Sequence, residues 1–587
     1  MRNIFPVPRT LQSGPSSSER TTANHWWRPF PGWTPLIGIL AVQAVLSVRL
    51  VHANTAFQDE ALYIWAGHLE IAHWVHGTSI PAFGAYFSGA PVIFPPLAAL
   101  ADSLGGLTAA RILSLLFMLG ATSFLWTTTS LLFNRRSAFF ASTLFAILGT
   151  TIRLGAFATY DAMSLCLLAL SAWCAVRAGS TERHSGWLVC AATALAFANA
   201  TKYVSAIFDP VVAGVMLAMG GRTFPWRYAL GRAVTMLVYA ASIVLLLLAF
   251  GGSEYVQSIF NSTLSRARGS DSTVSVLQVS WRLTGLLVVL AFAGALMTWI
   301  RAASSADKLL MTILALATLI VPISQARIHT LVSLDKHVDF GAWFASIAAG
   351  VAVDWLVRLV RVPRIRMVAT ASCIGLMAIP LHVGLRQSSD LFHSWPNSTS
   401  LMRTLRSELA HRSGPILAEH PSLPEFYLRQ GTQWYRWSST YVVRLPNGHS
   451  ISAVAGSRLA VNSFVRRINH GYFSVIVLDF GPTARMDEDL VASLKRNPNY
   501  QLVADVPYGR RGAEVWAYRT QPRVSTSALS PPSVAVPIVR EVLNPVERPS
   551  RVLGPILLAT EITGAIALIL MLLIRYGWRR GKASQEL

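Results

Sequence analysis

The run Thr55-Ala-Phe-Gln-Asp59-Glu60-Ala-Leu-Tyr63-Ile-Trp65 directly follows the first long apolar stretch of the chain, Pro35 to Val51. No lysine or arginine lies between Val51 and Ala110, so the two adjacent carboxylates have no cation in their own segment. Ionisable side chains near membrane depth are costly to place and are functional candidates by default. The run therefore predicts a membrane protein with a functional acidic pair at the mouth of its first helix.

The composition supports a membrane protein. The chain has 587 residues, of which 53% are hydrophobic and 13% charged, against about 25% charged residues in soluble proteins. The net charge of +22 does not indicate a nucleic-acid partner, because many of the basic residues separate apolar runs instead of clustering on a soluble module. The four cysteines lie inside apolar runs without metal-ligand spacing, and we interpret them as small buried hydrophobic residues.

Apolar runs of membrane length predict a polytopic α-helical protein with about twelve transmembrane helices. We place them at 34–52, 107–133, 137–152, 158–177, 186–200, 203–220, 229–250, 283–301, 309–324, 340–357, 367–385 and 552–574. Arginine and lysine recur in alternate connections, for example at Arg135-Arg136, at Arg222 and at Arg301, which the positive-inside rule assigns to the cytoplasm. This predicts that the basic, disordered leader 1–33 and the basic tail 575–587 are both cytoplasmic.

The long connections fall on the opposite, extracytoplasmic side, at 53–106, 251–282, 325–339 and 386–550. The last of these predicts a small α/β domain over 386–520, followed by a proline-rich linker over 521–549. Its expected elements are strands from Gly414 and over Tyr472–Phe480, a helix over Leu401–His411 and a strand pair over Gln501–Tyr518. Residues 34–385 would then form the transmembrane catalytic domain, with interfacial helices in the loop 53–106.

Polar residues occur at the extracytoplasmic ends of several predicted spans. Besides Asp59 and Glu60, these are Asp161 at the start of the fourth span, Lys202-Tyr203 in the turn after the fifth, and Arg327, His329, Lys336 and His337 in the loop before the tenth. Because they lie on one side at similar depth, we expect carboxylates and cations from distant segments to meet in one cavity.

This mixture of groups suits a particular chemistry. A carboxylate can take the proton of a hydroxyl nucleophile, and lysine, arginine or histidine can stabilise a phosphate leaving group. Such chemistry describes transfer of a sugar from a lipid phosphate to an alcohol. It needs no soluble nucleotide, and the sequence contains neither a P-loop nor a dinucleotide-binding fingerprint.

The motif Asp59-Glu-Ala-Leu-Tyr63 resembles the acidic motif of the protein O-mannosyltransferase and lipid A aminoarabinose transferase superfamily. The run Ala109-Ala-Arg111-Ile-Leu-Ser and the pair Tyr160-Asp161 are similar as well, so that the resemblance extends over about residues 34–385. It implies a GT-C fold, a polyprenyl-phosphate-linked sugar donor and a hydroxyl acceptor in the cell envelope. It also implies that Asp59 is the base of an inverting reaction and that Asp161 lines the site.

The chain departs from this family at one point. Bacterial members often have Glu-Lys-Pro-Pro-Leu late in the first loop, where this chain has Ile93-Phe94-Pro95-Pro96-Leu97. Phosphate binding is therefore expected to fall to Lys202, Lys336, His337 or Arg327. The sequence establishes no cofactor and leaves a divalent metal open. The helically spaced set Glu70, His73 and His76 lacks a fourth ligand, and we interpret it as interfacial.

Each candidate also has a structural interpretation. Asp59 and Asp161 suit helix caps, and Glu60 suits the first turn of a helix as well as an assistant to the base. Lys202 suits a snorkelling residue, and Arg111 pairs with an acid or snorkels. Arg111, Tyr63 and Tyr203 complete the candidate substrate-binding residues.

Two other functions compete with the glycosyltransferase hypothesis. A transporter or flippase of lipid-linked sugars also needs charged groups in a cavity, but is usually built on paired repeats with midplane charges, which we do not find. A receptor or assembly protein would use segment 386–550 and would leave the charges at the span ends unexplained.

Overall fold

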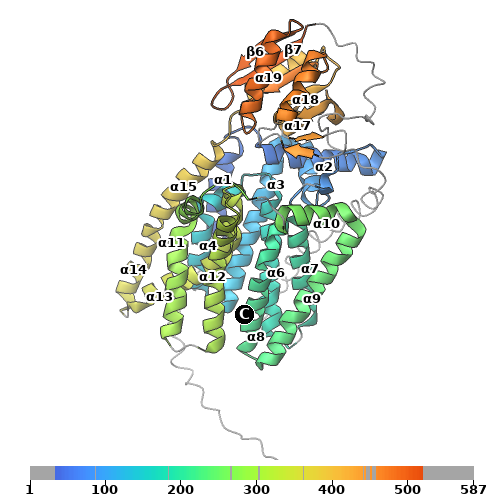
Figure 1. Cartoon of the computed structure of the whole chain (residues 1–587). Coiled ribbons are helices and arrows are strands. Elements are labelled where there is room, and N and C mark those ends of the chain that lie inside the picture. Colours follow the sequence, from blue (N-terminus) through green and yellow to red (C-terminus); the bar gives the residue numbers. More distant parts are fainter. Residues whose placement is uncertain are drawn as a thin grey trace, which may run out of the picture.

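The computed structural model describes residues 33–85, 87–182, 184–264, 268–301, 304–360, 362–440, 442–444, 450–452 and 458–519. It consists of a helical bundle with a smaller sheet domain at one end (Figure 1). The predicted linker, last span and tail, and the leader up to residue 32, lie outside the described residues.

Most of the bundle consists of long apolar helices. They are α1 (Thr34–Val51), α3 (Phe94–Leu132), α6 (Tyr160–Ser180), α7 (Ser185–Thr201), α8 (Asp209–Gly221), α9 (Trp226–Gly251), α11 (Thr273–Ile300), α12 (Ser305–Arg327), α13 (Leu334–Leu359), α14 (Pro363–Leu376) and α15 (Ala378–Phe392). Nine segments of the described residues are long and apolar enough to cross a membrane, and α7 is a shorter apolar helix. The predicted polytopic α-helical fold class is confirmed.

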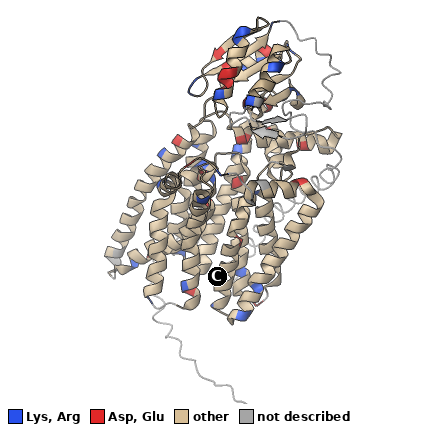
Figure 2. Cartoon of the chain, in the orientation of Figure 1, with Lys and Arg blue, Asp and Glu red and all other residues tan. Residues whose placement is uncertain are grey.

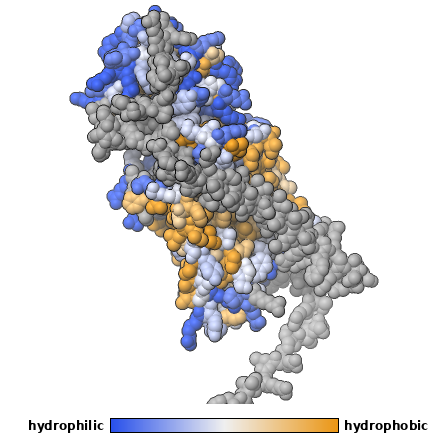
Figure 3. Space-filling view, turned by 90° about the vertical axis from the view of Figure 1, so that its right-hand side faces the viewer, coloured by the Kyte–Doolittle hydropathy of each residue, from blue (hydrophilic) through white to orange (hydrophobic). Residues whose placement is uncertain are grey.

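The distribution of charged and hydrophobic residues agrees with a bundle that spans a membrane. Charged residues are frequent in the sheet domain and near the bundle ends, and sparse between them (Figure 2). The visible face of the bundle has hydrophobic surface between the hydrophilic sheet domain and the hydrophilic opposite end (Figure 3). Helix α13 is the most enclosed of the long helices, since 83% of its most apolar 18-residue stretch is buried within the protein.

Several predicted spans differ from the structure. The span predicted at 203–220 becomes α-helical only at Asp209, and that at 367–385 is divided between α14 and α15. The span predicted at 137–152 is two shorter helices, α4 (Arg135–Ala146) and α5 (Gly149–Leu154), separated by the extended residue Leu148. Glycine and threonine favour helix weakly, which explains a break before Gly149-Thr-Thr. The span predicted to start at 107 belongs to a helix that already begins at Phe94, with non-helical backbone at Gly105-Gly106. The prolines following Phe94 occupy the first turn, where a missing N–H costs nothing.

The predicted first loop contains α2 (Gln58–His76) and the short turn η2 (Phe83–Ala85). Two short helical segments, α10 (Ser253–Ile259) and η4 (Phe260–Leu264), follow α9, and the 3-10 turn η3 (Tyr203–Phe208) connects α7 to α8. Helix α2 ends at His76 and is capped by Gly77, whose φ of 70° suits glycine; the helix packs against α3.

The sheet domain combines a mixed sheet with flanking helices, as predicted. Its elements are α16 (Thr399–Leu409), β1 (Ile416–Ala418), α17 (Ser422–Tyr427), β2 (Trp437–Ser439), β3 (Val442–Arg444), β4 (Ser450–Ser452), α18 (Arg458–Asn469), β5 (Val475–Leu478), α19 (Ala484–Arg496), β6 (Tyr500–Val506) and β7 (Ala513–Tyr518). The main sheet has the order β2-β1-β5-β7-β6, with β2, β1 and β5 parallel and β7 antiparallel to both neighbours.

The sheet domain contacts the bundle through α17 and the chain after it. Helix α17 packs on α2, and the backbone N–H of Ala56 donates to the Tyr427 hydroxyl at 2.7 Å. Arg429 pairs with Asp102 of α3 at 2.7 Å. The domain therefore lies against the segment that leads into the acidic pair.

Candidate active site

The two acidic residues that open α2 have different surroundings. Glu60 and Arg111 form a bidentate ion pair, with Nε to Oε1 at 2.8 Å and Nη2 to Oε2 at 2.7 Å, and both side chains are fully buried. Glu60 also accepts the backbone N–H groups of Phe57 and Ala158, at 2.9 and 2.8 Å. Of the two roles left open for Arg111, pairing with an acid is the one observed. Because both of its oxygens are engaged by these donors, Glu60 is not available to accept a proton from a substrate.

Asp59, one residue earlier, is accessible. Its side chain is 29% exposed, and its Oδ2 lies 2.6 Å from Nζ of Lys336, whose side chain is 5% exposed. The cation that the first loop lacks is thus supplied by the first turn of α13, the central helix of the bundle. Because α13 is so enclosed, the ion pair lies where the bundle interior meets the first loop.

A second carboxylate lies in the same region. Asp161, in the first turn of α6, is fully buried, and its Oδ1 is 3.5 Å from Nζ of Lys202 and 3.7 Å from Nε2 of His337. Lys202 follows α7, and His337 lies next to Lys336 on α13. We call Asp59, Asp161, Lys202, Lys336 and His337 the polar cluster. Its members come from four segments far apart in the chain, so the predicted meeting of the span ends takes place.

Hydroxyl groups line one side of the polar cluster. The Tyr63 hydroxyl donates to that of Tyr160 at 2.7 Å, and Ser88 Oγ lies 2.6 Å from the same Tyr160 oxygen. Lys202 Nζ donates to Ser88 Oγ at 3.2 Å and lies 4.4 Å from the centre of the Tyr160 ring. Burial and the nearby charge of Asp59 raise the pKa of Tyr63 well above its usual value, which keeps this phenol a neutral donor.

A close backbone contact positions Lys202 beside these hydroxyls. The N–H of Tyr203 donates to the Ser88 carbonyl at 3.0 Å, and the N–H of Ala90 donates to the Ala200 carbonyl at 2.8 Å. A Cβ on Gly89 would lie 2.0 Å from the Thr201 carbonyl oxygen. Only glycine lets the first loop approach the turn after α7 this closely.

Several charged neighbours of the cluster were not predicted from the sequence. Arg153 of α5 pairs with Asp335 of α13. Asp339, one turn after Asp335, accepts the Thr150 hydroxyl at 2.5 Å. Arg153 and Thr150 belong to α5, which was predicted as part of a continuous span. The only sequence signal for Asp335 and Asp339 was the charge density of the segment Asp335-Lys-His-Val-Asp339.

Arg327 does not join this group. The predicted loop 325–339 is shorter in the structure, because α12 extends to Arg327 and α13 begins at Leu334. Lys336 and His337 are therefore helical, whereas Arg327 is exposed at the end of α12. No contact among the described residues connects its side chain with the polar cluster. His329 also lies outside it, with Nδ1 3.2 Å from the Asp271 carbonyl oxygen.

The fold has counterparts of known function. ArnT from Cupriavidus metallidurans in the apo state is 16% identical, with a TM-score of 0.55 over 83% of this chain and 98% of ArnT. The archaeal oligosaccharyltransferase AglB from Archaeoglobus fulgidus, in complex with an inhibitory peptide and a dolichol-phosphate, is 13% identical, with a TM-score of 0.52 over 88% and 77%. The chain has the GT-C fold. The predicted resemblance to this superfamily is confirmed.

Sequence comparison adds to this GT-C assignment. The family model for dolichyl-phosphate-mannose-protein mannosyltransferase matches residues 90–249, which include Asp161 and Lys202 but not Asp59 or Lys336. ArnT from the same Cupriavidus species also has a structure bound to undecaprenyl phosphate, similar to this chain at 16% identity and a TM-score of 0.54 over 83% of this chain and 98% of ArnT. No curated protein sequence matches the chain significantly.

Proposed function

We propose that this GT-C protein is an integral-membrane glycosyltransferase that moves a sugar from a polyprenyl-phosphate donor to a hydroxyl acceptor of the cell envelope. The observation that carries the proposal is the polar cluster, in which an accessible aspartate lies beside buried lysines and a histidine from distant helices. Structural neighbours that bind undecaprenyl phosphate and dolichol-phosphate support a lipid-phosphate donor.

Asp59 is the general base in this proposal. Its carboxylate takes the proton of the acceptor hydroxyl while the hydroxyl oxygen attacks the anomeric carbon of the sugar. The bond from that carbon to the phosphate oxygen breaks on the opposite side, which inverts the configuration and releases polyprenyl phosphate. Asp59 suits this role because its side chain is 29% exposed, whereas that of Glu60 is fully buried.

The cations of the cluster stabilise the leaving phosphate. Lys202 and His337 lie beside the buried Asp161, and Lys336 is paired with Asp59; all three side chains are buried, where fixed charges act more strongly than in water. A phosphate in this position competes with Asp59 for the ammonium group of Lys336. The Asp59 carboxylate is then free to take the proton of the acceptor hydroxyl. Asp161 holds Lys202 and His337 in place between turnovers.

The remaining candidate residues receive other roles. Glu60 and Arg111 are positioning residues, because their mutual pairing fixes the start of α2 and hence the place of Asp59. The Tyr63 hydroxyl donates a hydrogen bond to the Tyr160 hydroxyl beside Lys202. The backbone N–H of Tyr203 donates to Ser88 and so holds the turn after α7 against the first loop. Arg327 has no place in the proposed chemistry.

We assign the polar cluster and the sheet domain to the extracytoplasmic side of the cell membrane, and both termini to the cytoplasm. The cluster lies at the bundle end that faces the sheet domain, through the contact of α17 with α2. Basic residues mark the opposite end of the bundle (Figure 2), as the positive-inside rule requires for a cytoplasmic face.

A transfer assay tests the proposal. Purified protein is incubated with a panel of radiolabelled polyprenyl-phosphate sugars and cell-envelope acceptors, and wild type is compared with Asp59→Asn. The expected result is transfer by wild type and a loss of at least a hundredfold in Asp59→Asn, in the range usual for general-base catalysis. Asp390→Asn, which changes an exposed acid of α15, is the matched control and should transfer as wild type does.

Two results would contradict the proposal. Unchanged transfer by Asp59→Asn would remove Asp59 as the base. No transfer from any donor, together with movement of lipid-linked sugar across reconstituted vesicles, would favour a flippase on the same fold.

A further inference from the structure

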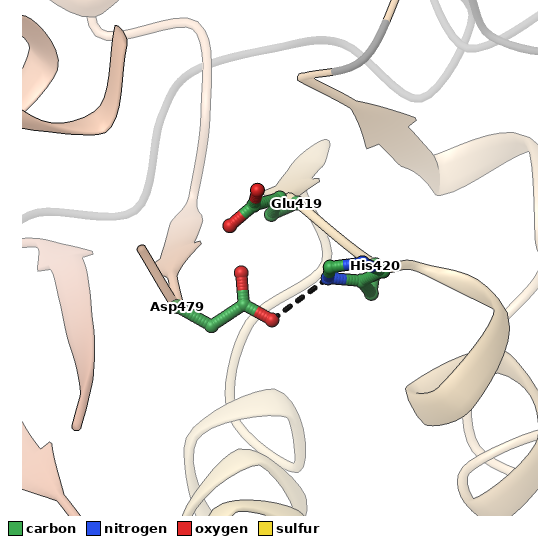
Figure 4. A group of neighbouring side chains, drawn as sticks. All are labelled: Glu419, His420 and Asp479. Atoms are coloured by element: carbon green, nitrogen blue, oxygen red, sulfur yellow. Dashed lines mark hydrogen bonds and ion pairs between the residues drawn. The ribbon is translucent and has the colours of Figure 1, made fainter. Parts of the chain in front are cut away.

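Three metal-ligating side chains gather at one edge of the main sheet. Glu419 and His420 directly follow β1, and Asp479 directly follows β5. Figure 4 shows their polar atoms facing one another between the two strand ends. One ligand atom of each lies within 4.8 Å of the others, and this is the only such group of three or more among the described residues. The helical set Glu70, His73 and His76 does not form one.

The position of this group in the topology is that of a ligand site. Strands β1 and β5 are parallel neighbours. The chain passes from β1 to β2 on one side of β1 and later enters β5 on its other side, so the strand order reverses between β1 and β5. In open α/β sheets, ligands bind outside the carboxyl ends of the strands at such a point.

The carboxylates have acceptor capacity that the protein does not use. Asp479 Oδ2 lies 2.8 Å from His420 Nδ1. The Asp479 side chain is only 8% exposed, yet its Oδ1 has no hydrogen-bond partner in the described part of the chain. Figure 4 shows this carboxyl turned toward that of Glu419. A buried oxygen without a partner is costly, and native proteins usually satisfy it with a donor, a water or an ion.

Backbone groups hold Glu419 in place. Its oxygens accept the N–H of Gly481 at 2.8 Å and that of Thr483 at 2.6 Å, which leaves each oxygen a further lone pair. Burial, together with the neighbouring Asp479, raises the pKa of Glu419 to about 10. A third carboxylate, Asp487, accepts the N–H of Phe480 nearby. Three carboxyl groups and one imidazole thus lie close together at this edge of the sheet.

We propose that Glu419, His420 and Asp479 bind a divalent transition-metal ion of the zinc or manganese type. The imidazole argues against magnesium and calcium, which take oxygen ligands, and no thiolate is present to select a softer ion. Two ligands about 2.0–2.2 Å from a metal lie about 3.0–3.5 Å apart, so the 2.8 Å pair of His420 and Asp479 needs only a small adjustment. Three protein ligands leave a position for water.

Such an ion would join two connections of the sheet domain. One leads from β1 into α17, which begins at Ser422, and the other leads from β5 to α19. Helix α17 packs on α2, and its Tyr427 hydroxyl accepts the N–H of Ala56, three residues before Asp59. The ion therefore stiffens the part of the sheet domain that rests on the mouth of the polar cluster. The site does not depend on the proposed transferase activity.

Metal binding to the full chain tests the site. Purified protein in detergent is stripped with EDTA and titrated with zinc chloride by calorimetry. Wild type is expected to bind zinc at a site whose affinity falls at least tenfold in both Glu419→Gln and Asp479→Asn. Asp489→Asn, which changes an exposed acid of α19, is the matched control and should retain it. Equal binding by wild type and Asp479→Asn, or no zinc binding by wild type, would overturn the proposal.

A second measurement uses wild type alone, in case the variants fold poorly. Histidine modification by diethyl pyrocarbonate is followed by mass spectrometry with and without zinc. Zinc should slow modification of His420 at least fivefold and leave His470, an exposed histidine after α18, unchanged. Modification of His420 at the same rate in both conditions would overturn the site.

Discussion

Replacing Glu60 by glutamine separates the two members of the acidic pair most sharply. The substitution keeps the size of the side chain and removes its charge. In the structure, Glu60 accepts four hydrogen bonds, two from Arg111 and one each from the N–H groups of Phe57 and Ala158. Glutamine retains one acceptor oxygen, so its amide NH₂ would face donors that it cannot satisfy.

The magnitude follows from the burial of the pair. Both side chains of the Glu60–Arg111 pair are fully buried, and removing one partner of such a pair costs about 3–5 kcal/mol. At about 2–4 °C per kcal/mol, the unfolding temperature should fall by roughly 6–20 °C. Asp59→Asn should lower it less, because Asp59 is 29% exposed and makes one ion pair.

The assay is thermal unfolding by intrinsic fluorescence in one detergent and at one scan rate, combined with sugar transfer per folded protein. Glu60→Gln should be the less stable variant but keep transfer within about tenfold of wild type, whereas Asp59→Asn should be the less active one. The double variant Glu60→Gln/Arg111→Met should lose less stability than the sum of its single changes, by about 1 kcal/mol or more. A Glu60→Gln protein as stable as wild type but inactive would refute the structural role and make Glu60 catalytic.

Two further predictions concern the first loop and the proposed metal site. Gly89→Ala should raise the KM for the donor and lower transfer at least tenfold, because the new Cβ would lie 2.0 Å from the Thr201 carbonyl oxygen and displace Lys202. Gly186→Ala is the control: a Cβ at Gly186 would have no atom within 4 Å, and transfer should not change. In EDTA, stability should fall as pH rises from about 5 to 9, since the raised pKa of Glu419 makes the folded state retain a proton that the unfolded state has released. If the unfolding temperature of Glu419→Gln fell with pH as steeply as that of wild type, Glu419 would not be the group responsible.

The sequence alone predicted the fold class and the region of the candidate site. Apolar runs of membrane length follow from the chemistry of the bilayer, which makes hydropathy a local property that can be read along the chain. Alternating apolar residues and turn residues likewise predicted the strands around Leu417, Ile476 and the pair up to Tyr518. The same reading placed Asp59, Asp161, Lys202 and Lys336 at one end of the bundle.

Pairing between these residues was beyond the sequence, because it depends on which helices pack together. Adjacent in the chain, Asp59 and Glu60 project in different directions from α2, so one meets Lys336 of α13 at 2.6 Å and the other meets Arg111 of α3. The break at Leu148, which places Arg153 against Asp335, is also a packing result. The pattern of hydropathy, which repeats along the chain, could therefore be read from the sequence. Contacts between distant segments were decided only by the tertiary structure, because the position of each partner depends on all the helices between them.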